Sequence, residues 1–305
     1  MAESAPQVAV VILNWKAREV TEECLRSLDE LTYRHFSVFL VDNASGDGSF
    51  EQFQADAASG IYSFPLHCMQ SGSNLGFAGG NNIGIHSAYQ DGFPLYWLLN
   101  NDTRVAPGSL SALVAEMQTH PDTGIAGSKI LFADSGRIWF AGGKVNTYFG
   151  KTTPIGFGAL DTAAFNQRME TEYITGCSLF FRKALIDSIG LMKEDYFLYY
   201  EETDWNLRAR AANWKVVYVP QSCVWHKVSV TTGSGRFAKP AVAYYDIRNA
   251  YLMIKRTQQS RLKTATAFLY KLFNVGKKLV KLIVYNQDEK RLRLAYIIKG
   301  LLANK

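Results

Sequence analysis

The sequence has few cysteines, and no two of them lie close together. The four are Cys24, Cys68, Cys177 and Cys223, and no C-x-x-C spacing occurs among the 305 residues. A zinc site needs clustered thiolates, and a disulfide framework needs many more cysteines per residue. The sequence therefore argues against both and favours a reducing compartment.

Targeting signals and long apolar runs are also missing. The first residues, M-A-E-S-A-P-Q, lack the basic and apolar regions of a signal peptide. No stretch approaches the ~18 uninterrupted apolar residues of a membrane-spanning helix. We therefore expect a cytoplasmic protein. Its 305 residues, 48% of them hydrophobic, suffice for one large domain with an appendage.

Acidic residues are scarce in the last part of the chain. From Lys255 to Lys305 there are 13 Lys or Arg against 2 acids, whereas the preceding 254 residues carry 20 basic and 25 acidic side chains. A mildly acidic body and a basic tail are expected to do different jobs. Nucleic acid is a poor partner, because the basic residues form no recognised binding motif.

The tail also separates apolar from basic residues at the spacing of a helix. The apolar face holds Phe268, Leu269, Leu272, Val275, Leu279, Leu282 and Ile283. The opposite face holds Lys271, Lys277, Lys278 and Lys281. This pattern is typical of a helix that lies on anionic lipid. The alternative is a helix that packs its apolar face on the body of the protein or on another subunit.

Short apolar runs alternate with helix-like segments at the start of the chain. The runs are Val8–Leu13, Phe36–Val41, Leu66–Met69 and Leu95–Leu99. Their lack of polar alternation is typical of parallel strands covered on both faces. We therefore predict an α/β protein with an open, mostly parallel sheet, in which ligands bind at the carboxyl ends of strands.

The middle of the chain is less regular. For residues 125–171 we expect short strands and a flexible loop. Order returns at Tyr173–Phe181, where we expect a strand with Gly176 inside it. Glycine within a strand often marks the close approach of a ligand.

Polar side chains follow the first two apolar runs. Asn14 ends the first run, and Asp42 ends the second run and opens the sequence D-N-A-S-G-D-G-S. A carboxylate at this place can accept hydrogen bonds from a ribose or from a base N–H. The same residue types also favour turns and helix caps. The pattern alone therefore leaves open whether they bind a ligand or stabilise a turn.

The motif N-L-G-F-A-G-G-N-N spans Asn74 to Asn82 and opens onto a helix-like segment. Backbone N–H groups at such a helix start can face an anion or a nucleotide. A helix entry capped by asparagine is the alternative. A dinucleotide-binding dehydrogenase is excluded, because the first turn, L-N-W-K-A-R-E, contains no glycine.

Three further positions carry chemistry. Asp102 follows a buried run in L-L-N-N-D-T and is a suitable ligand for Mg²⁺ or Mn²⁺, or simply a turn residue. Y-Y-E-E-T-D-W-N-L-R holds three acids among aromatic residues, which would raise a carboxylate pKa and suit it to proton abstraction. Acids at a helix start also complement its dipole. His226 ends an apolar run, where it is a ligand or a packed core residue.

Together these motifs resemble the family-2 inverting glycosyltransferases of the A-type fold (GT-A), in particular a bacterial rhamnosyltransferase-like subgroup. The resemblance covers residues 8 to about 230, and six segments carry it beside L-L-N-N-D-T: V-V-I-L-N-W (Val10–Trp15), V-D-N-A-S-G-D-G-S (Val41–Ser49), N-L-G-F-A-G-G-N-N (Asn74–Asn82), T-G-C-S-L-F-F-R (Thr175–Arg182), Y-E-E-T-D-W-N-L-R (Tyr200–Arg208) and V-W-H (Val224–His226). It implies a Rossmann-like catalytic domain over residues 1–235, with a nucleotide-binding half of about 1–105 and an acceptor half of 106–235. A basic helical extension over residues 236–305 would follow.

The resemblance also assigns the donor site. Asp42 would contact the nucleobase. The segments that carry Leu13, Asn14, Asn74, Gly79 and Asn82 would line the nucleotide pocket. Asn100, Asn101 and Asp102 occupy the place of the family's D-x-D motif. Asp102 would bind Mn²⁺ or Mg²⁺ between the two donor phosphates, with His226 completing the metal site, and Asn100 would face the ribose in place of the usual aspartate.

In the same resemblance the second acid of E-E-T-D is the general base, so Glu202 is the first candidate and Asp204 the second. Asp204 is alternatively expected to orient Trp205 and Arg208. Gly176 would leave room for the sugar, and Trp205 would pack against the donor or acceptor sugar. The implied reaction is a single displacement that inverts the anomeric carbon.

We therefore expect an enzyme that transfers a sugar from dTDP-rhamnose or a UDP-hexose to a hydroxyl of a glycan or lipid-linked acceptor, during cell-surface polysaccharide synthesis. The basic tail would hold it at the cytoplasmic membrane face, and a homo-oligomer is a further expectation. The alternative function is a non-catalytic nucleotide- or sugar-binding scaffold of the same fold. Retention of Glu202, Asp204, Asp102 and His226 together argues against that alternative.

Overall fold

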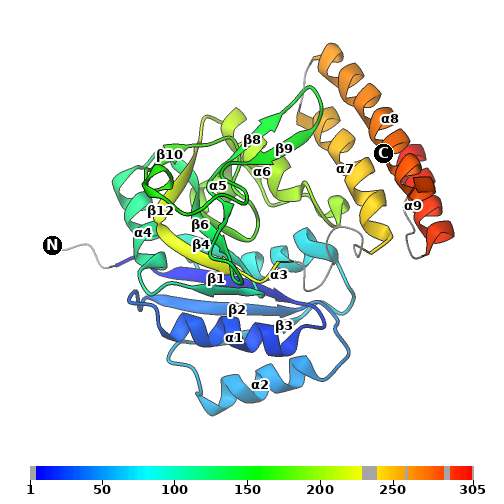
Figure 1. Cartoon of the computed structure of the whole chain (residues 1–305). Coiled ribbons are helices and arrows are strands. Elements are labelled where there is room, and N and C mark those ends of the chain that lie inside the picture. The colour runs from blue at the N-terminus through cyan, green and yellow to red at the C-terminus, as the bar shows by residue number, and fades with distance from the viewer. Residues whose placement is uncertain (1–4, 229–238, 258–259, 285–288, 304–305) are drawn as a thin grey trace.

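The computed structural model describes residues 5–228, 239–257, 260–284 and 289–303. Its centre is a mixed β-sheet with the strand order β10-β12-β6-β11-β4-β1-β2-β3, to which β5 and β7 add by pairing with β12 and β6. Helices flank the sheet, and the helices of the C-terminal extension stand together at one end of the molecule (Figure 1).

The first half of the sheet forms as the sequence predicts. Its strands are β1 (Val8–Asn14), β2 (Phe36–Asp42), β3 (Leu66–Gln70) and β4 (Leu95–Asn100). They run parallel in the order β3-β2-β1-β4, and in this register Asn14 lies beside Asp42 and Leu13 beside Asn100. The polar residues that end these strands therefore meet at one edge of the sheet.

The helices that connect these strands are α1 (Arg18–Asp29), α2 (Ser49–Ser59) and α3 (Gly76–Gln90). Helix α3 packs closely on β1 because two of its residues are glycines. A Cβ atom on Gly80 would lie 2.4 Å from Cδ1 of Leu13, and one on Gly84 would lie 2.6 Å from Cγ1 of Val11. The glycines of α3 thus permit close contact between helix and sheet.

The second half of the sheet is mixed, because β11 runs antiparallel to both of its neighbours, β4 and β6, whereas β12 runs parallel to β6. Its strands are β5 (Thr103–Val105), β6 (Thr123–Phe132), β7 (Ile138–Phe140), β10 (Met169–Glu170), β11 (Ser178–Arg182) and β12 (Lys215–His226). A separate hairpin consists of β8 (Gly143–Asn146) and β9 (Lys151–Pro154). The helical elements are α4 (Ser109–Thr119), α5 (Lys183–Ile189), α6 (Glu201–Ala211) and the 3₁₀ turns at Ala163–Phe165 and Glu194–Tyr196.

Two predictions for this half need correction. The segment 125–171 holds the expected short strands β7 to β10, but its start belongs to β6, a buried ten-residue strand between β12 and β11 that was not expected. This strand is hard to recognise in the sequence because Gly127 and Lys129 interrupt its apolar run. Glycine is needed at 127 because Ile174 packs 2.2 Å from where a Cβ would be, and Lys129 is accommodated because it pairs with Asp161 at 2.9 Å. Gly176 does not lie inside a strand, since β11 begins at Ser178 and Gly176 belongs to the turn before it.

The C-terminal extension consists of α7 (Ala241–Thr257), α8 (Arg261–Val284) and α9 (Lys290–Leu302). Helix α7 contacts α6 of the body on one side and both α8 and α9 on the other (Figure 1). The predicted boundary between residues 235 and 236 lies outside the described residues. Among the residues that the structure describes, no helix is both long and apolar enough to cross a membrane.

The predicted faces of α8 need correction. Val275 and Leu282 point inward and are buried, whereas Leu269 and Ile283, expected on the same face, are exposed. Lys271, expected on the basic face, is also buried, and its Nζ donates a hydrogen bond to the carbonyl of Ala303 at 3.0 Å. The single apolar face of the sequence pattern is therefore divided between the interior and the surface.

The close approach of α3 to β1 makes a prediction about stability. Gly84→Ala should lower the free energy of unfolding, because overpacking costs about 1–3 kcal/mol and outweighs the ~1 kcal/mol that alanine gains over glycine in a helix. Gly276→Ala in α8 is the matched control, since its Cβ would meet no atom within 4 Å; it should leave stability unchanged or raise it. Urea unfolding of both variants is the measurement, and equal stability of the two would contradict this packing.

Candidate active site

Asp102 and His226 come together at the carboxyl ends of β4 and β12. Asp102 follows β4, and the antiparallel pairing of β12 with β5 places His226 opposite Thr103. As a result His226 Nε2 lies 3.0 Å from Asp102 Oδ1, although the two residues are 124 apart in the sequence. Both are largely buried, at 8% exposure for Asp102 and 5% for His226.

The polar atoms of this pair are incompletely satisfied. Asp102 Oδ1 and His226 Nδ1 have no hydrogen-bond partner among the described residues, so the 3.0 Å approach lacks good hydrogen-bond geometry. Burial opposes a charged imidazole, but the neighbouring Cys177 and Asp102 outweigh it and raise the pKa of His226 to about 10. The surroundings of His226 therefore favour a positive charge at this place.

The same geometry suits a divalent cation. Two adjacent ligands of an octahedral ion at about 2.1 Å are separated by about 3.0 Å, which matches the gap between the Asp102 oxygen and the His226 nitrogen. Within the described part of the chain, no group of three or more His, Cys, Asp or Glu residues could hold a metal. The remaining positions would therefore come from water and from substrate phosphates, as is common for Mg²⁺.

The two asparagines before Asp102 have different surroundings. The Asn101 Nδ2 donates to the hydroxyl of Thr21 at 2.8 Å, so this side chain ties the strand end to α1. The side chain of Asn100 is half-buried and makes no hydrogen bond within the described part of the chain. Asn100 is therefore the one of the two that can hydrogen-bond a ligand hydroxyl.

The structure does not direct Asn14 or Asp42 toward a nucleobase. Asn14 is fully buried, and Asp42 is 1% exposed. The carboxylate of Asp42 accepts hydrogen bonds from Asn14 Nδ2 at 2.8 Å, from the backbone N–H and hydroxyl of Ser45, and from the hydroxyl of Ser49. Most of its acceptor capacity is used within the protein, which favours the turn chemistry that the sequence also allowed.

The asparagine-rich motif around α3 mostly builds its own loop. Asn74 Oδ1 accepts hydrogen bonds from the backbone N–H of Gly76 and from Asn43 Nδ2, and Asn43 also receives the N–H of Leu75. The sequence analysis missed Asn43, although an amide directly after Asp42 at a strand end was a signal for it.

Three other residues expected to line the pocket support packing instead. Gly79 lies inside α3, where a Cβ would meet Leu75 at 2.7 Å, and Leu13 covers Gly80. Asn82 Nδ2 donates to the carbonyl of Met192 and to Glu194, both at 3.0 Å. These residues shape the wall of the site from behind.

Glu202 lies in the first turn of α6, on the other side of the turn that contains Gly176. A Cβ on Gly176 would lie 3.8 Å from Cβ of Glu202 and 2.8 Å from the ring of Phe77. Gly176 was expected to leave room for a sugar, but the ring of Phe77 occupies the space beside it. The next residue, Cys177, accepts the backbone N–H of Asn100 at 3.0 Å and raises the pKa of His226. This single turn therefore connects Glu202 to the Asp102–His226 pair.

Both glutamates at the start of α6 favour protonation. Burial is the main reason that the pKa of Glu202 is raised, and the hydroxyl of Thr203, which donates to its Oε1 at 3.3 Å, opposes the shift. Glu201 is 3% exposed, and its Oε2 has no partner among the described residues. Burial and the charge of Glu202 raise the pKa of Glu201 well above its usual value. Burial thus favours the neutral form of both side chains, more strongly for Glu201 than for Glu202.

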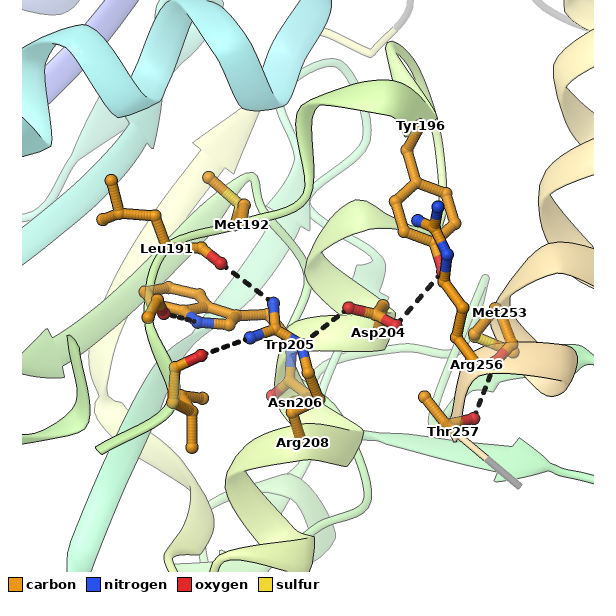
Figure 2. Close-up of polar contacts among 12 residues, drawn as sticks. Leu191, Met192, Tyr196, Asp204, Trp205, Asn206, Arg208, Met253, Arg256 and Thr257 are labelled. Atoms are coloured by element: carbon orange, nitrogen blue, oxygen red, sulfur yellow. Dashed lines mark hydrogen bonds and ion pairs between the residues drawn. The ribbon is translucent and has the colours of Figure 1, made fainter. Parts of the chain in front are cut away.

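Figure 2 shows why Asp204 and Trp205 are not at the site. Asp204 accepts hydrogen bonds from Arg208 Nε at 2.8 Å and from the Tyr196 hydroxyl at 3.1 Å, and it is 1% exposed. Trp205 is fully buried, and its Nε1 donates to the carbonyl of Gly190 at 2.9 Å. The prediction that Trp205 packs on a sugar was wrong, because this face of α6 points into the core. Asp204 orients Arg208, as the alternative expectation held.

The fold and this arrangement define a GT-A nucleotide-sugar transferase. The model of glycosyl transferase family 2 matches residues 9–189, so the chain belongs to that family and transfers glycosyl groups.

Relatives agree with this assignment. The chain is 28% identical over 246 residues to an N-acetylglucosaminyl-diphospho-decaprenol L-rhamnosyltransferase of Mycobacterium tuberculosis, covering 73% of this chain and 77% of that protein. It is 23% identical over 246 residues to the low-salt glycan biosynthesis hexosyltransferase Agl10 of Haloferax volcanii, covering 80% and 74%. The mannosyltransferase PcManGT of Pyrobaculum calidifontis, solved with GDP-Man and Mn²⁺, has the same fold at a TM-score of 0.62 and 15% identity, over 99% of this chain and 88% of that one.

Proposed function

We propose that this protein is a metal-dependent, inverting glycosyltransferase in which Glu202 is the general base and Asp102 and His226 bind the divalent cation. The observation that carries the proposal is the turn at residues 176–177, which connects Glu202 on one side to Asp102 and His226 on the other. A base and an unsatisfied metal-ligand pair at one sheet edge are the two groups that a displacement at an anomeric carbon requires.

The mechanism follows from the properties of these groups. Glu202 takes the proton from an acceptor hydroxyl while that oxygen forms a bond to the anomeric carbon and the bond to the donor diphosphate breaks on the opposite face. A raised pKa makes this carboxylate a stronger base than an exposed glutamate. The cation, held by Asp102, His226 and the donor phosphates, would neutralise the charge of the leaving diphosphate. Asn100, whose side chain makes no hydrogen bond among the described residues, would hydrogen-bond the donor ribose.

The substrates we propose are a dTDP-rhamnose or UDP-hexose donor and a hydroxyl on a glycan or lipid-linked acceptor of cell-surface polysaccharide synthesis. Support comes from the mycobacterial relative, which is named as a rhamnosyltransferase acting on an N-acetylglucosaminyl-diphospho-decaprenol. Asp42 and Asn14 keep the donor loop in shape rather than contact the base, because their polar atoms are already hydrogen-bonded.

We further propose that α8 rests on an anionic membrane surface. The side of α8 that faces away from α7 exposes a row of large apolar residues: Leu262, Leu269, Phe273, Val280 and Val284. Lys277 and Lys281 are exposed beside this row. An apolar row flanked by lysines matches lipid tails beneath anionic head groups, and a lipid-linked acceptor would bring the enzyme to that surface.

The base assignment predicts that Glu202→Gln lowers release of nucleoside diphosphate from dTDP-rhamnose or UDP-hexose by about 10²–10⁴-fold, because the amide cannot accept the proton. In the wild type the rate should fall as pH drops through the raised pKa of Glu202, since the base must be deprotonated. Glu201→Gln is the matched control: it replaces a neutral buried acid by a neutral amide and should keep the activity. Equal rates for wild type and Glu202→Gln would remove the base assignment.

The metal assignment predicts that Mn²⁺ raises the melting temperature of the wild type in the presence of a nucleoside diphosphate and that Asp102→Ala abolishes this shift. The aspartate supplies the only carboxylate beside His226 in the described part of the chain. Asp134→Ala, which changes an exposed carboxylate outside this pair, is the control and should keep the shift. A shift that survives in Asp102→Ala would place the metal elsewhere.

The membrane assignment predicts that the protein sediments with phosphatidylglycerol-containing vesicles but not with pure phosphatidylcholine vesicles. Leu269→Glu combined with Phe273→Glu should abolish the binding, because burial of each apolar side chain contributes about 1.5–3 kcal/mol. Ile61→Glu, at an exposed apolar residue of the body, should bind normally. If the wild type does not bind the vesicles but dimerises in solution through the apolar row of α8, a second copy of the chain covers α8 instead.

A further inference from the structure

The loop that leads into the base-carrying helix has an unusual backbone. Phe197, Tyr199 and Tyr200 have φ angles of 63°, 68° and 74°, and none of them is glycine. Bulky residues in this left-handed region cost about 1–3 kcal/mol each and persist only where the surroundings hold them. Glu202 follows two residues after this loop, so whatever holds residues 194–200 also aims Glu202.

The strongest hold comes from the C-terminal extension. Asn249 of α7 is fully buried, and its Nδ2 donates hydrogen bonds to the carbonyls of Tyr196, Leu198 and Tyr199 at 2.9, 2.7 and 3.0 Å. Its Oδ1 accepts a hydrogen bond from Arg248 at 3.0 Å. This orientation is the required one, since the reverse would point an oxygen at three carbonyl oxygens. One amide thus gathers three carbonyls of the left-handed loop.

A second attachment runs along the same helix. Arg256 forms an ion pair with Asp195 at 2.8 Å and lies 5.1 Å above the ring of Tyr196. The Tyr196 hydroxyl in turn donates to Asp204 in α6, as Figure 2 shows. The extension therefore reaches the base helix through the loop and through this aromatic side chain.

The opposite side of the loop holds the donor-side motif. The carbonyl of Phe197 accepts the backbone N–H of Phe77 at 2.7 Å, and a Cβ on Gly76 would lie 2.1 Å from that carbonyl oxygen. The loop is therefore a junction between the glycine-rich start of α3, the base helix α6 and the extension helix α7. The loop keeps its strained backbone only if its contacts with α3 and with α7 are both present.

We propose that Asn249, assisted by Arg256, is a positioning residue for the transfer reaction: α7 holds the loop at residues 194–200 in the conformation that aims Glu202, so the extension is part of the catalytic unit. This rests on the proposed role of Glu202 as the base. Asn249 itself does not touch the reacting atoms.

The test uses the full chain with Asn249→Asp, which keeps the size but removes the donor, and with Asn249→Ala. Both should lower kcat for nucleoside diphosphate release at least tenfold while the KM for the donor changes less than threefold, because Asn249 contacts none of the proposed donor-binding residues Asn100, Asp102 and His226. The acidic limb of the pH–rate profile should move to lower pH, since water that enters beside Glu202 lowers its raised pKa. Hydrogen exchange of residues 194–204 should become faster.

Thr257→Val is the matched control in the same helix. Its hydroxyl bonds only within α7, to the carbonyl of Met253 at 2.7 Å (Figure 2), so its loss should change neither kcat nor exchange. If the Asn249 variants do not fold, Arg256→Gln tests the same loop from the surface and should give smaller changes of the same sign.

Four results separate the proposals. Unchanged exchange of residues 194–204 in the folded Asn249 variants, or unchanged kcat with a loosened loop, overturns the positioning role. An equal loss in kcat and in donor affinity also overturns it, because that result indicates a general structural role. A wild type without any nucleoside diphosphate release overturns the proposed function instead, and the exchange measurement still decides whether α7 holds the loop.

Discussion

The site depends on the short antiparallel pairing between β12 and β5. This pairing places His226 opposite Thr103, the residue after Asp102, so the two side chains approach to 3.0 Å although they are far apart in the chain. The pairing in turn needs β6, since β12 runs parallel to this buried strand along most of its length. A central strand that carries no candidate site residue thus determines where Asp102 and His226 meet.

Much of the polar chemistry of the motifs serves the scaffold. Asn14 and Asp42 form a buried network with Ser45 and Ser49, and Asn43 closes the next loop over Asn74. Buried polar groups must be hydrogen-bonded, and these ones satisfy each other completely or nearly so. Within these motifs, buried atoms of Asn82, Asp102, Glu201 and His226 have no hydrogen-bond partner among the described residues, and Glu202 has little internal bonding.

The sequence predicts the first half of the fold well because its strands are uninterrupted apolar runs that end in polar residues. It predicts β6 poorly, since Gly127 and Lys129 interrupt the run for reasons that lie in Ile174 and Asp161, distant partners that no local pattern reveals. The family resemblance predicts that Asp102, His226 and Glu202 share one site. In the structure Asp102 and His226 lie 3.0 Å apart, and Glu202 lies beside Gly176, the residue before Cys177. The side on which a residue of α6 points could not be predicted, because acids, tryptophan and arginine alternate there without an apolar period, and so Trp205 was assigned to the wrong face. The role of Asn249 could not be predicted either, because a single asparagine in a helix forms no sequence pattern that would show its hydrogen-bond partners.

Helix α7 has two neighbours with different tasks, the left-handed loop on one side and the α8–α9 pair on the other. If α7 holds the loop that aims Glu202, a load on the α8–α9 pair that shifts α7 would change turnover without a matching change in donor affinity. Anchoring the extension at a surface would then act on the rate of the reaction rather than on the binding of its donor.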